Sequence, residues 1–396
     1  MRVYSCSWVV PVSRPPIAGG RVAVDGGRVV WVGGPGEAGA PAGEAHDLGA
    51  GVLLPGLVNA HCHLELSHLA GLDRTVSGGL VPWVEALMAQ RGQTDDDGVR
   101  AATRKAIRQL ESTGTVAVGD VSNVLGHLDL LERSSLRAVV FYELIGFDPA
   151  RAEAILTGAD RVLALARQSP LRTRIVLAAH APYSVSKALF EGIAARGGAG
   201  SLHLAESPAE TELVADGDGA WRGFLDRRGL SAVPFDARGQ SPVAYVDGLG
   251  ALQAGTVCAH CVQVDDADCA TLAARGVFVA LCPRSNRALE AGTAPVPRLL
   301  AAGVRLCLGT DSLASAATLD LMEEMALLQA QFPELDPAVI VRMATAGGAE
   351  ALGQAALGAI EPGRSADLAF APAATSPEDP CRFLTSGRAQ AGPLPS

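Results

Sequence analysis

The sequence lacks any cluster of lysine and arginine residues. The 396-residue chain carries 32 basic and 42 acidic side chains, which gives a formal net charge of -10 at pH 7. A nucleic acid or an anionic membrane surface would require clustered positive charges to bind its phosphates. We therefore expect no nucleic-acid partner and no membrane partner.

Long apolar runs are also missing. No stretch reaches the roughly 18 residues of a membrane span, and the N-terminus has no apolar core followed by a small-residue cleavage site. The eight cysteines are scattered instead of forming a disulfide framework. We therefore expect a cytoplasmic protein whose cysteines are free thiols in a reducing compartment, most of them small core residues.

Several common catalytic and architectural patterns are absent as well. The chain contains no Gly-x-x-x-x-Gly-Lys phosphate loop, no Gly-x-Ser-x-Gly nucleophile elbow and no tandem repeat of regular period. What it does contain is 48% hydrophobic and 19% charged residues. A chain of this length and composition can bury a sizeable core and exceeds one ordinary domain.

The first 55 residues carry short β-branched runs separated by glycine pairs. The run from Gly20 to Val32, Gly-Arg-Val-Ala-Val-Asp-Gly-Gly-Arg-Val-Val-Trp-Val, predicts a β-hairpin with its turn near Asp25-Gly26. We expect a small β domain here, and not the functional site.

From residue 57 onward, strand-like runs alternate with amphipathic helical stretches such as residues 97–111. Eight such units predict an α/β fold, a closed (β/α)8 TIM-type barrel over residues 56–357, with its site on the loops after the strands. The predicted strands are 57–61, 115–121, 137–144, 174–180, 201–205, 256–260, 277–282 and 304–309.

Two histidines follow the first predicted strand, His61 and His63, with Cys62 between them. Successive strand side chains alternate faces, so both imidazoles can bind one metal ion while Cys62 points elsewhere. Unrelated core histidines would have no reason to gather at strand ends. The carboxyl ends of later apolar runs nevertheless carry His180, His203 with Glu206, His260 and Asp311. This shared placement favours one functional site over separate core histidines.

The order of these motifs resembles the amidohydrolase superfamily, in its deaminase and chlorohydrolase branch, across nearly the whole chain. Pro55-Gly-Leu-Val-Asn-Ala-His-Cys-His63 is similar to the opening metal motif, and His203-Leu-Ala-Glu206 to the third ligand and the acid. Cys282-Pro-Arg-Ser-Asn286 resembles the segment after the seventh strand, and Gly363-Arg-Ser-Ala-Asp-Leu368 the closing signature.

This resemblance implies that residues 358–396 complete the N-terminal β domain, so that the two chain ends form a composite β-sandwich. The sequence after about residue 370 is rich in Pro, Ala and Ser. We therefore expect shortened final strands and disorder over residues 385–396.

The predicted metal ligands are three imidazoles and one carboxylate, a set suited to a divalent first-row ion. They are His61, His63, His203 and Asp311. Zinc is the first choice and iron the second. Neither the spacing of the ligands nor the composition of the chain separates the two metals. Binuclear relatives use a bridging carboxylated Lys or a Glu at the fourth strand, whereas Arg174-Ile-Val-Leu-Ala-Ala-His180 contains no Lys. We predict one divalent ion per chain.

Such an ion lowers the pKa of its bound water toward 7 and makes hydroxide available. We expect Asp311 and His260 to take and orient the water proton, and Glu206 to protonate a ring nitrogen before ammonia leaves. Each candidate also has a structural alternative. Glu206 could be a solvated helix-start carboxylate, Asp311 a turn or N-cap residue, and His180 a core histidine.

The strings at residues 61–67, 82–85 and 282–286 look most like aminodeoxyfutalosine deaminases of menaquinone biosynthesis. Close relatives of those enzymes act on S-adenosylhomocysteine and methylthioadenosine. The resemblance implies a hydrolytic deaminase of an adenine-containing nucleoside, with His180 as a substrate-binding residue. Further substrate-binding candidates are Glu65, Ser67, Trp83 and Arg284, the last for a benzoate carboxylate.

Other interpretations stay open. The same barrel could hydrolyse a cyclic amide or a chlorotriazine. It could also serve as an inactive scaffold, although every predicted metal-ligand position keeps a residue that can bind a metal. His63-x-Glu65 with Cys258-x-x-Cys261 contains the ingredients of the zinc site in cytidine-type deaminases, but the second half lacks its preceding Pro. The oligomeric state is also open, a homodimer included.

Overall fold

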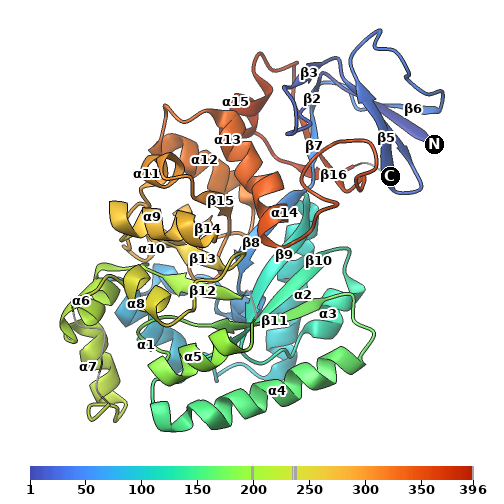
Figure 1. Cartoon of the computed structure of the whole chain (residues 1–396). Coiled ribbons are helices and arrows are strands. Elements are labelled where there is room, and N and C mark those ends of the chain that lie inside the picture. Colours follow the sequence, from blue (N-terminus) through green and yellow to red (C-terminus); the bar gives the residue numbers. More distant parts are fainter. Residues whose placement is uncertain (198–199, 234, 236–238, 395–396) are drawn as a thin grey trace.

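The computed structural model describes residues 1–197, 200–233, 235 and 239–394, and it shows an α/β fold (Figure 1). Two four-stranded parallel sheets form its centre, with strand orders β11-β10-β9-β8 and β12-β13-β14-β15. All eight predicted strands are present, and each predicted boundary is within about one residue of the observed one. They are β8 (Leu57–Cys62), β9 (Thr115–Ser122), β10 (Arg137–Leu144), β11 (Arg174–Ala179), β12 (Ser201–Leu204), β13 (Val257–His260), β14 (Phe278–Leu281) and β15 (Arg305–Leu308).

Backbone contacts also join the outer strands of the two sheets. At one side, the His203 N–H just inside β12 donates to the carbonyl of His180, which follows β11, at 2.8 Å. At the other side, Cys62 and Asp311 form an isolated parallel bridge, and the Thr310 N–H donates to the His61 carbonyl at 3.0 Å. The carboxyl ends of β8 and β15, and those of β11 and β12, therefore lie side by side.

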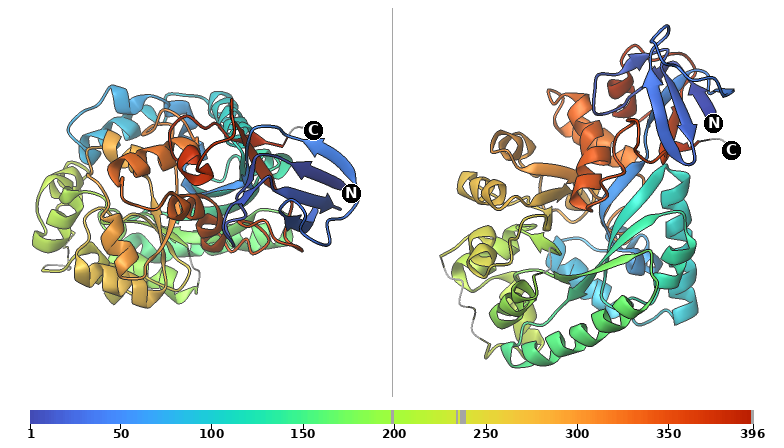
Figure 2. Two further views of the ribbon diagram at one scale, coloured as in Figure 1. Left: turned by 90° about the horizontal axis from the view of Figure 1, so that it is seen from above. Right: turned by 45° about the vertical axis from the view of Figure 1, so that its right-hand side comes forward.

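Most of these strands are buried on both faces, as expected of parallel strands covered by helices. Helices such as α2 and α4 flank them (Figure 2). Helix α2 matches the predicted stretch at 97–111: Asp95 caps it by accepting from Gly98 N–H, and its buried face carries Ala106, Ile107 and Leu110. The helices between β8 and β12 are α1 (Leu80–Gln90), α2 (Asp96–Ser112), α3 (Leu128–Arg133), α4 (Ala152–Gln168) and α5 (Lys187–Ala195), with short 3-10 turns η1 (Leu64–Leu69), η2 (Leu72–Arg74) and η3 (Pro149–Arg151).

Among the described residues, three helices lie between β12 and β13 in the chain. They are α6 (Pro208–Asp216), α7 (Ala220–Arg227) and α8 (Pro242–Gly248). The remaining helical segments are α9 (Asp266–Arg275), α10 (Pro283–Ala288), α11 (Val296–Ala301), α12 (Leu321–Gln331), α13 (Pro337–Arg342), the π-helical turn η4 (Met343–Gly347), α14 (Gly348–Ala351) and α15 (Pro380–Leu384).

Two more sheets lie where the chain termini come near each other (Figures 1 and 2). One has the order β5-β4-β1-β6 and the other β17-β16-β7-β2-β3. The predicted hairpin is present as β4 and β5, and its turn residues Gly26 and Gly27 have φ of 54° and 73°, which only glycine adopts readily. The strands are β1 (Arg2–Ser5), β2 (Trp8–Val9), β3 (Ile17–Ala18), β4 (Arg21–Asp25), β5 (Arg28–Gly33), β6 (Glu44–Asp47), β7 (Gly51–Pro55), β16 (Leu368–Pro372) and β17 (Gly392–Pro393).

The expected disorder over residues 385–396 is wrong for the described part of that segment. Strand β17 pairs with β16, which in turn pairs with β7. Ala389 and Ala391 are buried in the main core, because small side chains fit between the sheet and its neighbours where composition alone indicated an unpacked tail. Residues 395 and 396 lie outside the described residues.

All eight cysteines are buried free thiols, as predicted. Within the described ranges, no helix is long and apolar enough to span a membrane.

Candidate metal centre and active site

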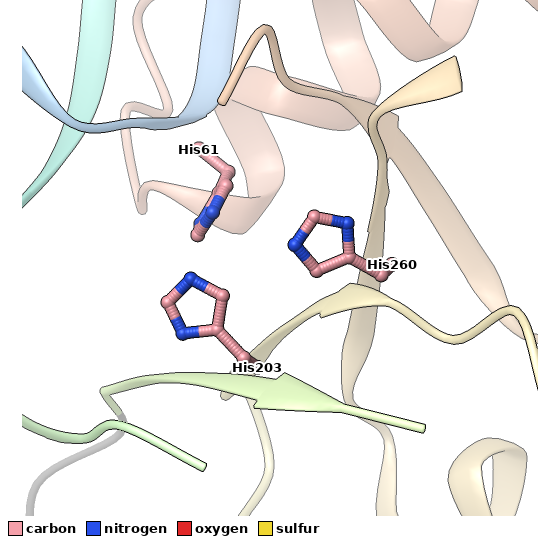
Figure 3. A group of neighbouring side chains, drawn as sticks. All are labelled: His61, His203 and His260. Carbon is pink, nitrogen blue, oxygen red and sulfur yellow. The ribbon is translucent and has the colours of Figure 1, made fainter. Parts of the chain in front are cut away.

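Three imidazoles from three strands point toward one another at the carboxyl ends of the sheets (Figure 3). The ring centroid of His61 lies 4.9 Å from that of His203 and 5.6 Å from that of His260. His63 joins them, because its Nε2 lies 3.3 Å from His61 Nε2 and 3.1 Å from His203 Nε2. The residues that sequence spacing selected therefore meet in one place.

Asp311 completes this cluster. Its Oδ1 lies 3.4 Å from His63 Nε2 and 3.9 Å from His61 Nε2. Its Oδ2 accepts hydrogen bonds from the hydroxyls of Ser285, at 2.5 Å, and Ser315, at 3.0 Å. One carboxylate oxygen is thus fixed by hydroxyl donors, which leaves the other directed at the imidazoles. Burial alone would raise the pKa of Asp311, but His63, His260 and the Ser285 hydroxyl outweigh it and hold the pKa below its usual value.

The donor set fits a divalent cation. Two imidazole nitrogens at the distances seen here repel one another through their lone pairs unless a proton or a metal cation lies between them. Ligand atoms around a tetrahedral ion with bonds of about 2.0–2.1 Å are separated by roughly 3.3 Å. The Nε2 separations of 3.1 and 3.3 Å match that spacing.

The backbone is strained where these side chains emerge. Ala205, His260 and Asp311 have φ of 50°, 71° and 57°, a left-handed conformation that L residues rarely adopt. Glu210 stabilises the left-handed conformation of Ala205. Its two carboxylate oxygens accept hydrogen bonds from the N–H groups of Ala205 and Glu206 at 2.8 and 2.9 Å. Such strain persists at functional sites because surrounding contacts maintain it.

Glu206 and His260 face each other beside the cluster. Glu206 Oε1 lies 3.6 Å from His260 Nε2, and His260 Nδ1 lies 2.8 Å from the Asn286 Oδ1 acceptor. His260 therefore carries its proton on Nδ1, and its Nε2 lone pair faces Glu206. Glu206 is only 2% exposed, so it is not a solvated helix-start carboxylate. Burial raises its pKa, an effect that His260 and His203 offset only in part.

The cluster opens into a cavity of about 360 Å³, within the size range of small-molecule sites. Its lining includes His63, His203, Glu206, His260 and Asp311. One wall is apolar and aromatic, and there the rings of Tyr183 and Trp221 stack with their centroids 3.8 Å apart. The apolar wall also includes Trp83, Phe147, Phe224, Leu225 and Leu230.

A second wall is polar, and its side chains are bonded to one another. Glu65 pairs with the guanidinium of Arg91 and accepts from the Asn123 N–H at 3.0 Å. The Asn123 side-chain amide donates to Glu143 Oε2 at 2.9 Å. An aromatic wall and a polar wall in one cavity suit a planar ring that bears hydroxylated or charged substituents.

The predicted substrate-binding residues divide into two groups. His180, Glu65 and Trp83 line the cavity, whereas Ser67 and Arg284 are not among its lining residues. The Ser67 hydroxyl donates to the Leu64 carbonyl at 2.7 Å. The Arg284 guanidinium donates to the Thr318 hydroxyl at 3.2 Å and forms an ion pair with Glu323 at 2.9 Å. The cavity is lined instead by Arg91, Arg151 and Arg228.

Sequence reasoning missed Asn123, Glu143 and Trp221. Glu143 is the penultimate residue of β10, so the strand-end rule that selected the histidines could have found it. Trp221 lies on α7 and gives no such signal. The rival zinc site also fails, because none of the potential metal-binding groups in the described chain contains a cysteine.

Comparisons with known proteins agree with this geometry. Residues 52–388 match the model of the amidohydrolase family. The chain is 33% identical over 371 residues to the 5-methylthioadenosine/S-adenosylhomocysteine deaminase of Syntrophobacter fumaroxidans, covering 88% of this chain and 79% of that one. It is 33% identical over 355 residues to the aminodeoxyfutalosine deaminase of Deinococcus radiodurans, covering 84% and 81%.

A solved adenosine deaminase from Xanthomonas campestris, with bound zinc, superposes with a TM-score of 0.81 at 27% identity, covering 99% of this chain and 92% of that one. The chain therefore belongs to the amidohydrolase family, as its motifs predicted. It is a hydrolase that acts on C–N bonds, and its imidazole and carboxylate cluster supports a divalent metal.

Proposed function

We propose that the protein is a metal-dependent deaminase of an adenine-containing nucleoside, which replaces the 6-amino group by oxygen and releases ammonia. The observation that carries this proposal is the pair Glu206 and His260, buried beside four metal-type donors at the bottom of an aromatic cavity. Relatives named for adenine nucleosides support the substrate class at 33% identity.

The proposed metal ligands are His61, His63, His203 and Asp311, and the proposed ion is a single Zn²⁺, with iron second. The zinc bound to the Xanthomonas campestris enzyme supports this choice. When bound, the ion lowers the pKa of a water molecule toward 7 and so supplies a nucleophile at neutral pH.

The chain's own residues carry the protons. Burial favours the protonated form of Glu206, which therefore can donate to a ring nitrogen and make the attacked carbon more electrophilic. His260 offers the Nε2 lone pair, and Asp311 a fixed carboxylate oxygen, to take and orient the water proton. His180 lines the cavity and holds Ser184 Oγ at 2.5 Å through Nδ1, which leaves Nε2 for the substrate.

We propose aminodeoxyfutalosine as the substrate, with S-adenosylhomocysteine or methylthioadenosine as the alternative. The aromatic wall at Tyr183 and Trp221 suits a purine. A tail carboxylate needs a cationic partner. Arg151 and Arg228, which line the cavity and are exposed, are better placed for that role than Arg284.

The architecture that fits this function is a closed (β/α)8 barrel over residues 56–357. The contacts of His203 with His180 and of Cys62 with Asp311 at the outer strands support closure. We also propose that residues 1–55 and 358–396 form one β-sandwich domain. The pairing of β16 with β7, and a shared apolar cluster that includes Tyr4, Val22, Leu53 and Phe370, support it.

A nucleoside panel tests the proposed function. Zinc-loaded enzyme is given aminodeoxyfutalosine, S-adenosylhomocysteine, methylthioadenosine and adenosine, with a chlorotriazine and a hydantoin as the competing class. Ammonia release and the ultraviolet change from adenine-like to hypoxanthine-like are followed. We expect the highest kcat/KM on aminodeoxyfutalosine. Preference for another nucleoside selects the alternative, and turnover of only the triazine or the hydantoin contradicts the proposal.

A further inference from the structure

We propose that Glu143 is a positioning residue, which holds the metal ligand His203 in the tautomer that binds the ion, and that Asn123 holds Glu143 in turn. This inference rests on the proposed function only in taking His203 as a ligand. It concerns the polar wall of the cavity, whose residues have no role in the proton transfers described above.

The two ring nitrogens of His203 meet different surroundings. Nε2 lies on the ligand side, 3.1 Å from His63 Nε2. Nδ1 lies 3.2 Å from the His180 carbonyl oxygen and 3.4 Å from Glu143 Oε1. Both neighbours of Nδ1 are acceptors, so the proton belongs on Nδ1 and the lone pair on Nε2.

A carbonyl alone could select this tautomer, but the Glu143 carboxylate adds a full negative charge. A carboxylate behind a ligating imidazole makes that imidazole more basic and restricts its rotation. Glu143 is 5% exposed. Within the described part of the chain its ion-pair partner is His203, and neither Lys nor Arg neutralises it. Its charge therefore acts on His203 and also on the neighbouring His180, since ring and carboxylate atoms of the three residues lie within 4.8 Å of one another.

Glu143 is itself held in place. The Asn123 side-chain amide donates to Glu143 Oε2 at 2.9 Å and to the Glu143 carbonyl at 3.1 Å. The Asn123 Oδ1 accepts from Arg91 at 3.1 Å. Because Asn123 bonds to both the backbone and the side chain of Glu143, the carboxylate cannot swing away from the ring without breaking these bonds.

A second metal ion is the competing interpretation, because Glu143, His180 and His203 also come within reach of one ion. That ion would need the lone pair of His203 Nδ1 while Nε2 serves the first site, so the ring would have to lose both protons. Two acceptors already face Nδ1 at hydrogen-bonding distances. The geometry therefore favours a protonated Nδ1 and one ion.

The test compares Glu143→Gln with Glu65→Gln. Glu65 is the matched control, since it is another buried carboxylate of the same wall that bonds to Arg91, Ser122 and Asn123 and to no histidine ligand. The affinity for Zn²⁺ is measured by competition with a chromophoric chelator, without nucleoside. We expect Glu143→Gln to weaken binding by about 10- to 100-fold, and Glu65→Gln to weaken it clearly less, because Glu65 reaches Glu143 only through Asn123.

Three results would overturn the proposal. Equal weakening in both variants would make the effect a general one of cavity charge. Unchanged zinc affinity with a raised KM would make Glu143 a substrate contact. Two zinc equivalents in the wild type and one in Glu143→Gln would establish the second site. Since no nucleoside is used, failure of the substrate assignment leaves this measurement intact.

Misfolding of Glu143→Gln is detected by the melting temperature of the metal-free protein. In that event Asn123→Ser decides, because it keeps the Glu143 charge but removes the amide that holds it. We expect a smaller loss of zinc affinity in the same direction, and wild-type affinity in Asn123→Ser would contradict the proposal.

Discussion

The middles and the carboxyl ends of the eight parallel strands bury very different side chains. The middles contribute small, branched or aromatic apolar residues to one cluster, including Ala60, Ala117, Phe141, Ala178 and Cys307. The ends bury ionisable side chains and hold the left-handed residues Ala205, His260 and Asp311. Apolar burial stabilises the fold by about 25 cal/mol per Å², whereas buried charge and strained backbone reduce stability unless a partner compensates.

The difference shows where changes should affect stability and where they should affect chemistry. The strand middles can be altered at the expense of the free energy of unfolding. Changes at the strand ends should lower metal binding or turnover if the proposed function is correct. The four predictions that follow set these two regions against each other.

The largest expected effect comes from the proposed metal ligands. His203→Ala and Asp311→Ala each remove one of the four donor side chains of the cluster. Each donor atom lies within 3.9 Å of another donor atom. We expect both variants to lose most of their bound metal and to lower activity by about four orders of magnitude or more, roughly 5 kcal/mol. Metal analysis of purified protein together with ammonia release measures both. Full metal occupancy in either variant would remove that residue from the ligand set.

In the strand middles, Phe141→Ala should act on stability instead. Phe141 is 2% exposed and lies in the cluster at the centre of the strands. We expect the free energy of unfolding in denaturant to fall by about 3–5 kcal/mol, the usual cost of such a cavity. The kcat of the folded, metal-loaded fraction should stay within a few-fold of wild type. A loss of kcat without a loss of stability would break the division between the two regions.

Glu206→Gln should separate chemistry from metal binding at the strand ends. Gln keeps the size of the side chain but cannot donate the carboxyl proton, so we expect kcat to fall by roughly 10²-fold or more, about 2.7 kcal/mol. Metal content and melting temperature should remain close to wild type, because Glu206 lies beside the ligands. A near wild-type kcat would eliminate the catalytic role, and loss of metal would make Glu206 a ligand.

The smallest effect is a pH dependence of stability at Glu324, a buried carboxyl on α12. Burial raises its pKa to about 8, against an ordinary value of 4.5, and Arg284 offsets this only in part. Between these values the folded state binds more protons than the unfolded one, so Glu324 makes stability fall as pH rises. Glu324→Gln should therefore show a smaller drop in Tm from pH 5 to pH 8.

The exposed neighbour Glu323 provides the control for that experiment. Glu323→Gln should keep the wild-type dependence of Tm on pH. If Glu324→Gln also keeps it, the carboxyl does not titrate in this window.

Much of this molecule could be predicted from the sequence. The strands alternate with amphipathic helices such as α2. The spacing of apolar residues differs between strands and helices, so a change in that spacing marks each boundary. The placement of His61, His203 and Asp311 followed from one geometric rule, that parallel strands end at the same edge.

The rest depends on contacts between distant segments. Arg284 appeared free for a substrate carboxylate, but Thr318 and Glu323 occupy it, and no local pattern announces that contact. Trp221 reaches the cavity only because α7 packs against α6 and α1, which stacks its ring on Tyr183. Ala391 is buried by segments distant in the sequence. The composition of the tail does not reveal such contacts.

The most direct test of a one-metal hydrolytic site at the strand ends is a titration of metal-free enzyme with Zn²⁺, following ammonia release from the preferred nucleoside. We predict no activity without metal and a linear rise that stops at one equivalent per chain. A rise that continues to two equivalents, or turnover by the metal-free protein, would contradict the assignment of His61, His63, His203 and Asp311 to a single catalytic ion.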